Sequence, residues 1–73
     1  MPEQIVSAPM KARVIRYHLE EGAAVQERDR VCDLEALKME IPVLSPAAGT
    51  LKALNASPGD NVQAGDPLFT VDT

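Results

Sequence analysis

Short runs rich in β-branched and other aliphatic residues follow one another along the chain, and proline or glycine separates each run from the next. Regularly spaced short strands with turn residues between them are typical of an all-β sandwich or barrel. At residues 58–60, Pro-Gly-Asp is a turn sequence because proline presets φ and glycine accepts a positive φ. The pattern predicts strands at residues 5–8, 12–18, 31–36, 39–44, 50–54 and 68–72.

The hydrophobic pattern occurs twice without a gap. Gly22 aligns with Gly59, 37 positions later, and the same offset relates positions throughout the chain. The other matched pairs include Val6 with Val43, Pro9 with Pro46, Val25 with Val62, Gln26 with Gln63, Asp29 with Asp66 and Leu34 with Val71. An internal repeat is stronger information than local propensity. Two similar halves must turn at their junction, where Lys38 lies.

Residues 33–40 conflict locally with this interpretation, because nearly all of them favour helices. Four apolar residues could line one helical face, namely Val31, Leu34, Leu37 and Ile41. The repeat argues against a helix. Residues 31–34 align with residues 68–71, which directly follow Gly65 and Pro67, where too few residues remain for a useful helix. We therefore expect Lys38 on a tight turn between two strands. A pseudo-twofold relation between the halves would place it at the end of the domain farthest from the termini.

Composition limits the function of the chain. A chain of 73 residues is expected to form one domain, residues 1–73. It buries only about 60% of its unfolded surface. Tyr17 and Phe69 are the only aromatic residues, so aliphatic side chains must fill a small core. This argues against a deep substrate cavity and an autonomous enzyme.

The net charge, the apolar runs and the cysteine content indicate which binding partners and which cellular compartment fit the chain. The net charge of −4 disfavours nucleic acid and anionic membranes. No apolar run approaches the roughly 20 residues that span a bilayer. The first four residues lack signal-peptide character. The single cysteine cannot form an internal disulfide, which fits a cytoplasmic protein.

Metal and acid–base chemistry find little support in the sequence. His18 and Cys32 are too few for a zinc site. His18 aligns with Asn55 and is expected at the surface, whereas Cys32 aligns with Phe69 and is expected to be a half-buried apolar residue. Three aspartates, Asp29, Asp60 and Asp66, are expected to cap turns.

Three motifs resemble the biotinyl/lipoyl attachment domain family over essentially the whole chain. They are Ala-Pro-Met at residues 8–10, Glu-Ala-Leu-Lys-Met-Glu at residues 35–40, and an intact Gly-Asp-x-Val-x-x-Gly-Asp-x-Leu at residues 59–68. The chain looks closest to short stand-alone biotin/lipoyl attachment proteins and biotin carboxyl carrier domains. The resemblance implies a flattened β-barrel of two four-stranded antiparallel sheets.

The same resemblance implies that Lys38 carries covalent biotin and that Leu37 and Met39 flank it as recognition residues. Glu35, Ala36 and Glu40 complete the motif with weaker implied roles: for the two glutamates, recognition by the ligase or solubility alone. The implied partners are a biotin ligase, a biotin carboxylase and a carboxyltransferase. The domain itself would be a monomeric carrier without catalytic residues.

Three departures from the family pattern are visible: Leu37 replaces the usual methionine, Arg28 stands where the second half has Gly65, and Ala12 replaces a common glycine. Lipoyl domains usually place an acidic residue before the lysine and alanine after it, so Leu37 and Met39 fit biotin better. Two alternatives stay open. One is a lipoyl or dual carrier; the other is an unmodified structural module.

Overall fold

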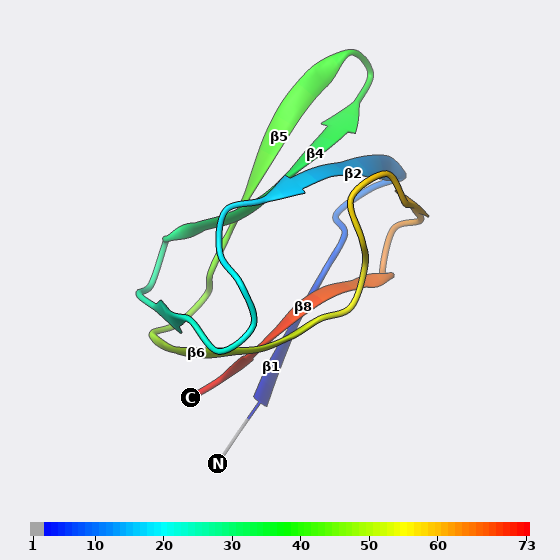
Figure 1. The fold of residues 1–73 in the computed structure, drawn as a ribbon. Coiled ribbons are helices and arrows are strands. Elements are labelled where there is room, and N and C mark those ends of the chain that lie inside the picture. The colour runs from blue at the N-terminus through cyan, green and yellow to red at the C-terminus, as the bar shows by residue number, and fades with distance from the viewer. Residues whose placement is uncertain (1–2) are drawn as a thin grey trace.

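The computed structural model describes residues 3–73, which form eight β-strands and no helix (Figure 1). The strands are β1 (Glu3–Ser7), β2 (Ala12–Tyr17), β3 (Ala24–Val25), β4 (Arg30–Ala36), β5 (Met39–Leu44), β6 (Gly49–Leu54), β7 (Asn61–Val62) and β8 (Pro67–Asp72). All six predicted strands are present, with ends that differ by up to two residues. The sequence pattern missed β3 and β7, because two residues are too few to show a periodicity.

The strands form two four-stranded antiparallel sheets, with orders β1-β8-β6-β3 and β5-β4-β2-β7. The 37-residue offset relates β1 to β5, β2 to β6, β3 to β7 and β4 to β8. Exchanging every strand for its counterpart converts the first order into the second. The predicted all-β class and pseudo-twofold repeat are therefore confirmed. Each sheet takes two strands from each half of the chain, so the halves are interleaved.

Backbone hydrogen bonds repeat with the same offset. The Gly22 amide donates to the Leu51 carbonyl at 2.7 Å, and the Gly59 amide donates to the Val14 carbonyl at 2.7 Å. Both glycines have a positive φ, 90° and 92°. Glycine adopts this conformation without steric cost, which explains its recurrence at this turn.

The core lies between the two sheets and is mainly aliphatic. Its fully enclosed side chains come in repeat-related pairs: Val14 with Leu51, Val31 with Leu68, Leu34 with Val71, and Cys32 with Phe69. Tyr17 of β2 reaches across to the other sheet, where its hydroxyl donates to the Leu68 carbonyl at 2.7 Å. Burial raises the pKa of this hydroxyl to about 12. Tyr17 therefore joins the sheets while its polar end stays hydrogen-bonded.

The molecule is elongated, with principal extents of 35 × 19 × 17 Å. The β4–β5 hairpin projects from one end, and β1 begins beside the end of β8 at the other (Figure 1). Glu3 and Asp72 are register partners at that second end. The hairpin is therefore the part of the domain that stands farthest from both ends of the described chain.

Candidate functional site

A two-residue turn, Leu37 and Lys38, joins β4 to β5, and Ala36 pairs with Met39 below it. Leu37 and Lys38 both have positive φ, 53° and 63°. This is the pattern of a type I′ turn, whose twist matches that of the flanking strands. The predicted tight turn is confirmed, although asparagine and glycine are the usual residues there. Two larger side chains in the left-handed region cost on the order of 1–2 kcal/mol each.

The side chains around the amine are open to solvent. Leu37 is 88% exposed and Met39 is 65% exposed, and Lys38 between them in sequence is also exposed. Ala36, in contrast, is buried in the core. Among the motif residues, a macromolecule approaching the tip would thus meet one primary amine, two apolar side chains and the half-exposed Glu35 and Glu40, but not Ala36.

The two motif glutamates face each other across the hairpin as register partners, and each is paired with an arginine of β2. Arg13 Nη2 lies 2.9 Å from Glu35 Oε1. Arg16 Nη1 lies 3.1 Å from Glu40 Oε1. Both carboxylates are thus engaged within the domain, an arrangement that the sequence analysis did not foresee.

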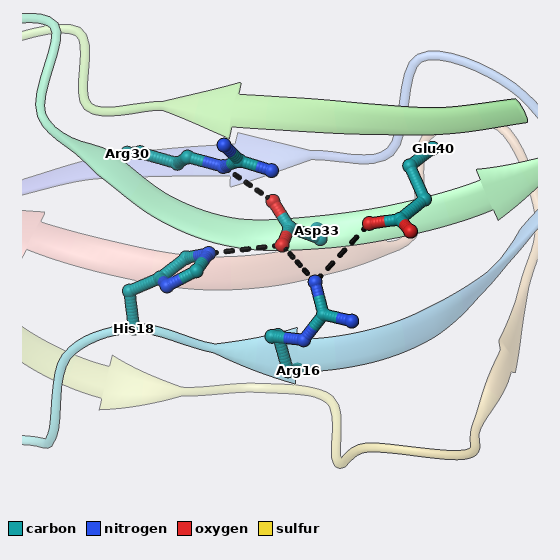
Figure 2. Close-up of polar contacts among 5 residues, drawn as sticks. All are labelled: Arg16, His18, Arg30, Asp33 and Glu40. Carbon is teal, nitrogen blue, oxygen red and sulfur yellow. Dashed lines mark hydrogen bonds and ion pairs between the residues drawn. The ribbon is translucent and has the colours of Figure 1, made fainter.

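A charged cluster around Asp33 lies on the same sheet (Figure 2). The Asp33 side chain is completely buried, and cationic or hydrogen-bonding groups from β2, β4 and the residue after β2 surround it. Arg16 Nη1 lies 2.5 Å from Oδ2, His18 Nε2 lies 2.9 Å from Oδ2, and Arg30 Nε lies 2.7 Å from Oδ1.

These contacts determine the pKa of Asp33 and therefore its charge. Burial raises the pKa of the carboxyl, but hydrogen bonds from Arg30, His18 and Arg16 outweigh burial and lower the pKa to about 2. Asp33 is therefore a buried anion at neutral pH. A buried charge is tolerated only when it is paired in this way. The sequence carried a signal for the cluster, because Asp33 interrupts the apolar run Val31–Leu34.

His18 lies at the surface as predicted, with 37% of its side chain exposed, but it is engaged by Asp33. Cys32 corrects the prediction of a half-buried residue, since it is fully buried. Its inward-facing position in β4 corresponds to that of Phe69 in β8. Burial, and then the nearby Asp33 charge, raise the pKa of the thiol to about 12.

The three aspartates expected to cap turns do so. A carboxylate oxygen of Asp29 accepts from the Gln26 amide at 2.8 Å, and Asp66 accepts from Gln63 at 2.9 Å. Asp60 caps the Ser57 amide in the same way, at 2.9 Å. Side-chain bonds of this kind stabilise turns.

Residues 3–73 show no sign of a metal site or of a membrane-spanning helix. No group of three or more His, Cys, Asp or Glu residues in this range is arranged to hold a metal ion. The same range contains no helix of the length and hydrophobicity needed to cross a membrane.

An interleaved β-barrel that presents one lysine at an exposed hairpin tip is the architecture of a cofactor-carrier domain. The family model described as Biotin-requiring enzyme matches residues 4–71. The chain belongs to this biotin/lipoyl attachment family.

Individual proteins show the same relationship. A biotinylated protein TB7.3 homolog from Mycobacterium leprae is 41% identical over 90% of the chain and 93% of its own length. A methylcrotonoyl-CoA carboxylase subunit alpha from Oryza sativa is 41% identical over 96% of the chain, which is 10% of that protein. Other relatives are also longer, and the chain spans 6% and 49% of two of them.

Among solved structures, the lipoyl domain of the 2-oxoglutarate dehydrogenase complex from Azotobacter vinelandii superposes with a TM-score of 0.82. It is 25% identical, and the match covers 94% of this chain and 95% of that domain. The barrel is therefore shared by domains that carry different groups, so the fold does not choose between biotin and lipoate.

Proposed function

We propose that Lys38 is the attachment site for biotin and that the domain carries carboxylate for a biotin-dependent carboxylase. The observation that carries this proposal is the exposed type I′ turn, which presents the Lys38 amine between two exposed apolar residues. In the attachment reaction, Lys38 Nζ would attack the carboxyl carbon of biotin that a ligase has activated. The new amide bond would replace the bond to the activating group, which leaves, and the amine nitrogen would lose a proton. Bound biotin would supply a ureido nitrogen that takes up and releases carboxylate.

The residues of the hairpin have different proposed roles: one is the attachment point, and the others bind the ligase or support the turn. Lys38 provides the nucleophilic amine and a long flexible arm. Leu37 and Met39 are proposed contacts for the ligase, because exposed apolar groups beside a modified residue offer binding area. Ala36 is buried, so we assign it to the packing of the hairpin base.

The proposed partners are a biotin ligase, a biotin carboxylase and a carboxyltransferase, which supply the catalytic groups. The similarity to a carboxylase subunit and to a biotinylated protein supports them. A monomeric state and a cytoplasmic location remain predictions from the sequence.

The test is intact-mass analysis and peptide mapping after co-expression with a biotin ligase and, separately, with a lipoate ligase. We expect one biotin per chain on Lys38, lost in Lys38→Arg. Lys11→Arg and Lys52→Arg are matched controls, because both remove an exposed lysine outside the hairpin. Biotin on Lys11 or Lys52, or no adduct at all, would contradict the proposal.

A lipoyl carrier is the second candidate, and the similarity to a lipoyl domain favours it. The same experiment separates the two, since lipoate and biotin add different masses to the Lys38 peptide. Modification by the lipoate ligase alone would assign the chain to lipoyl carriers. Modification by both would show that Leu37 and Met39 do not discriminate between the ligases.

A further inference from the structure

The hairpin that presents Lys38 contains an unfavourable pair. Glu35 and Glu40 are direct register partners on its two strands. Like charges placed opposite each other destabilise a pair of strands. Both glutamates are half-exposed, so solvent alone would only weaken their repulsion. Arg13 and Arg16 of β2 each take one of the carboxylates, which converts the repulsion into two contacts between the hairpin and the barrel.

Arg16 differs from Arg13 in how firmly it is held. The same Nη1 atom that contacts Glu40 also lies 2.5 Å from Asp33, whose side chain has no exposed surface. Arg30 and His18 fix the Asp33 carboxylate from the other sides (Figure 2). An exposed ion pair usually gives up much of its energy to side-chain entropy. A buried anion that already orients the guanidinium reduces this loss, so Arg16 can hold Glu40 in place.

The other half of the chain shows that the fold does not require this charge. The offset of 37 replaces Asp33 with Thr70, His18 with Asn55 and Arg16 with Ala53. Thr70 Oγ1 donates to Asn55 Oδ1 at 3.0 Å, so a neutral hydrogen bond stands where His18 meets Asp33. The charged version occurs in the sheet that carries the Lys38 hairpin.

We propose that Arg16 is a positioning residue, which braces the β5 arm of the hairpin against β2 and so holds the Lys38 turn in the orientation that a modifying enzyme requires. Its action runs through Glu40, which lies two residues after Lys38. The consequence for Lys38 modification rests on the proposed carrier function, but the bracing of the hairpin does not.

The first test is hydrogen exchange on the unmodified domain. In Arg16→Met, which keeps the aliphatic stem, amides of residues 39–41 should exchange about two- to fivefold faster, as expected for loss of a surface-type pair. Amides of β6 and β8 should change less than those of residues 39–41, because only the general loss of stability from the missing Arg16–Asp33 contact reaches them. Arg16→Lys should restore part of the protection. Lys52→Met is the matched control, because Lys52 pairs with Glu3, the repeat counterpart of Glu40, in the other sheet. Unchanged exchange at the hairpin would overturn the proposal.

The second test is the kcat/KM of biotin attachment in a cycle of Arg16→Met, Glu40→Gln and the double variant. We expect each single change to lower kcat/KM by about two- to fivefold and the double variant to be no worse than either. If the losses of kcat/KM add in the double variant, or if Glu40→Gln loses kcat/KM while Arg16→Met does not, the ligase contacts Glu40 directly. Either result would overturn the bracing role. If the wild-type domain accepts no biotin, the biotin-carrier function fails, and hydrogen exchange alone decides the bracing of the hairpin.

Discussion

Arg28 and Gly65 occupy equivalent turns but are very different residues. Their φ angles are 73° and 91°, and each amide donates to an equivalent carbonyl, Ser45 at 2.8 Å and Ala8 at 2.9 Å. The sequence comparison shows that Arg28 stands where the other half has a glycine, and the structure shows that the backbone at Arg28 does have a positive φ. The two turns therefore share one backbone conformation, which suits glycine better than arginine.

Arg28→Gly is accordingly expected to be neutral or to stabilise the domain by up to about 1 kcal/mol, since relief of left-handed strain is partly offset by the greater chain entropy of glycine. Urea unfolding measures the change. Gly65→Ala is the reciprocal control: a Cβ there would meet no atom within 4 Å, so any loss reports the φ angle alone. A clear fall in stability for Arg28→Gly would show that the arginine side chain makes a stabilising contribution.

Asp33 gives a second prediction at this scale, because its folded-state pKa of about 2 lies below its ordinary value of 3.8. A lowered pKa contributes stability above pH 3.8, and that stability is lost as the pH falls towards 2. Asp33→Asn should lower the free energy of unfolding by about 2 kcal/mol at pH 7. The difference from wild type should shrink between pH 4 and pH 2 in urea titrations. A difference that stays constant over this range would contradict the assigned pKa.

The hairpin at residues 33–40 shows what the sequence could and could not predict at the scale of an element. Local propensity favours a helix there, and only the repeat identifies two strands and a turn. Strand pairing overrides helix propensity here. β4 lies between β2 and β5, so its backbone amides and carbonyls form hydrogen bonds on both sides. The partners of Asp33 were not predictable, since strand register decides which residues meet, and a bulge near Ile15 shifts the register between β2 and β4.

Strand β6 provides the prediction for this scale. A Cβ added to Gly49 would lie 2.4 Å from the backbone oxygen of Asp72, at the end of β8, where Asp72 is the register partner of both Glu3 and Thr50. Gly49→Ala should therefore destabilise the domain by about 1–3 kcal/mol. Ala12 occupies the equivalent position in the first half, so Ala12→Gly is the matched control and should change stability by less than about 1 kcal/mol. Equal stability of Gly49→Ala and wild type would show that β6 and β8 separate more easily than their packing indicates.

At the scale of the whole molecule, the repeat explains how the two halves of the chain build one domain. Neither half of the chain can complete a four-stranded sheet by itself, because the β2–β4 pair needs β5 and β7 from the other half, and the β6–β8 pair needs β1 and β3. The junction between the halves becomes the hairpin tip, so the most exposed residues of the hairpin are those least needed for the core. This arrangement places the strained, exposed turn outside the packed core of the barrel.

Two peptides, residues 1–37 and residues 38–73, test this interleaving. Each alone should be disordered by circular dichroism, because it would expose half of every core pair. An equimolar mixture should regain the β-sheet spectrum in a concentration-dependent manner, since the interface between the halves is the core itself. Cutting the Lys38 turn then costs only the entropy of association, which the covalent link removes in the intact chain. Folding of either peptide alone would contradict the interleaved architecture, and a mixture that stayed disordered would show that the turn directs pairing as well as presenting the lysine.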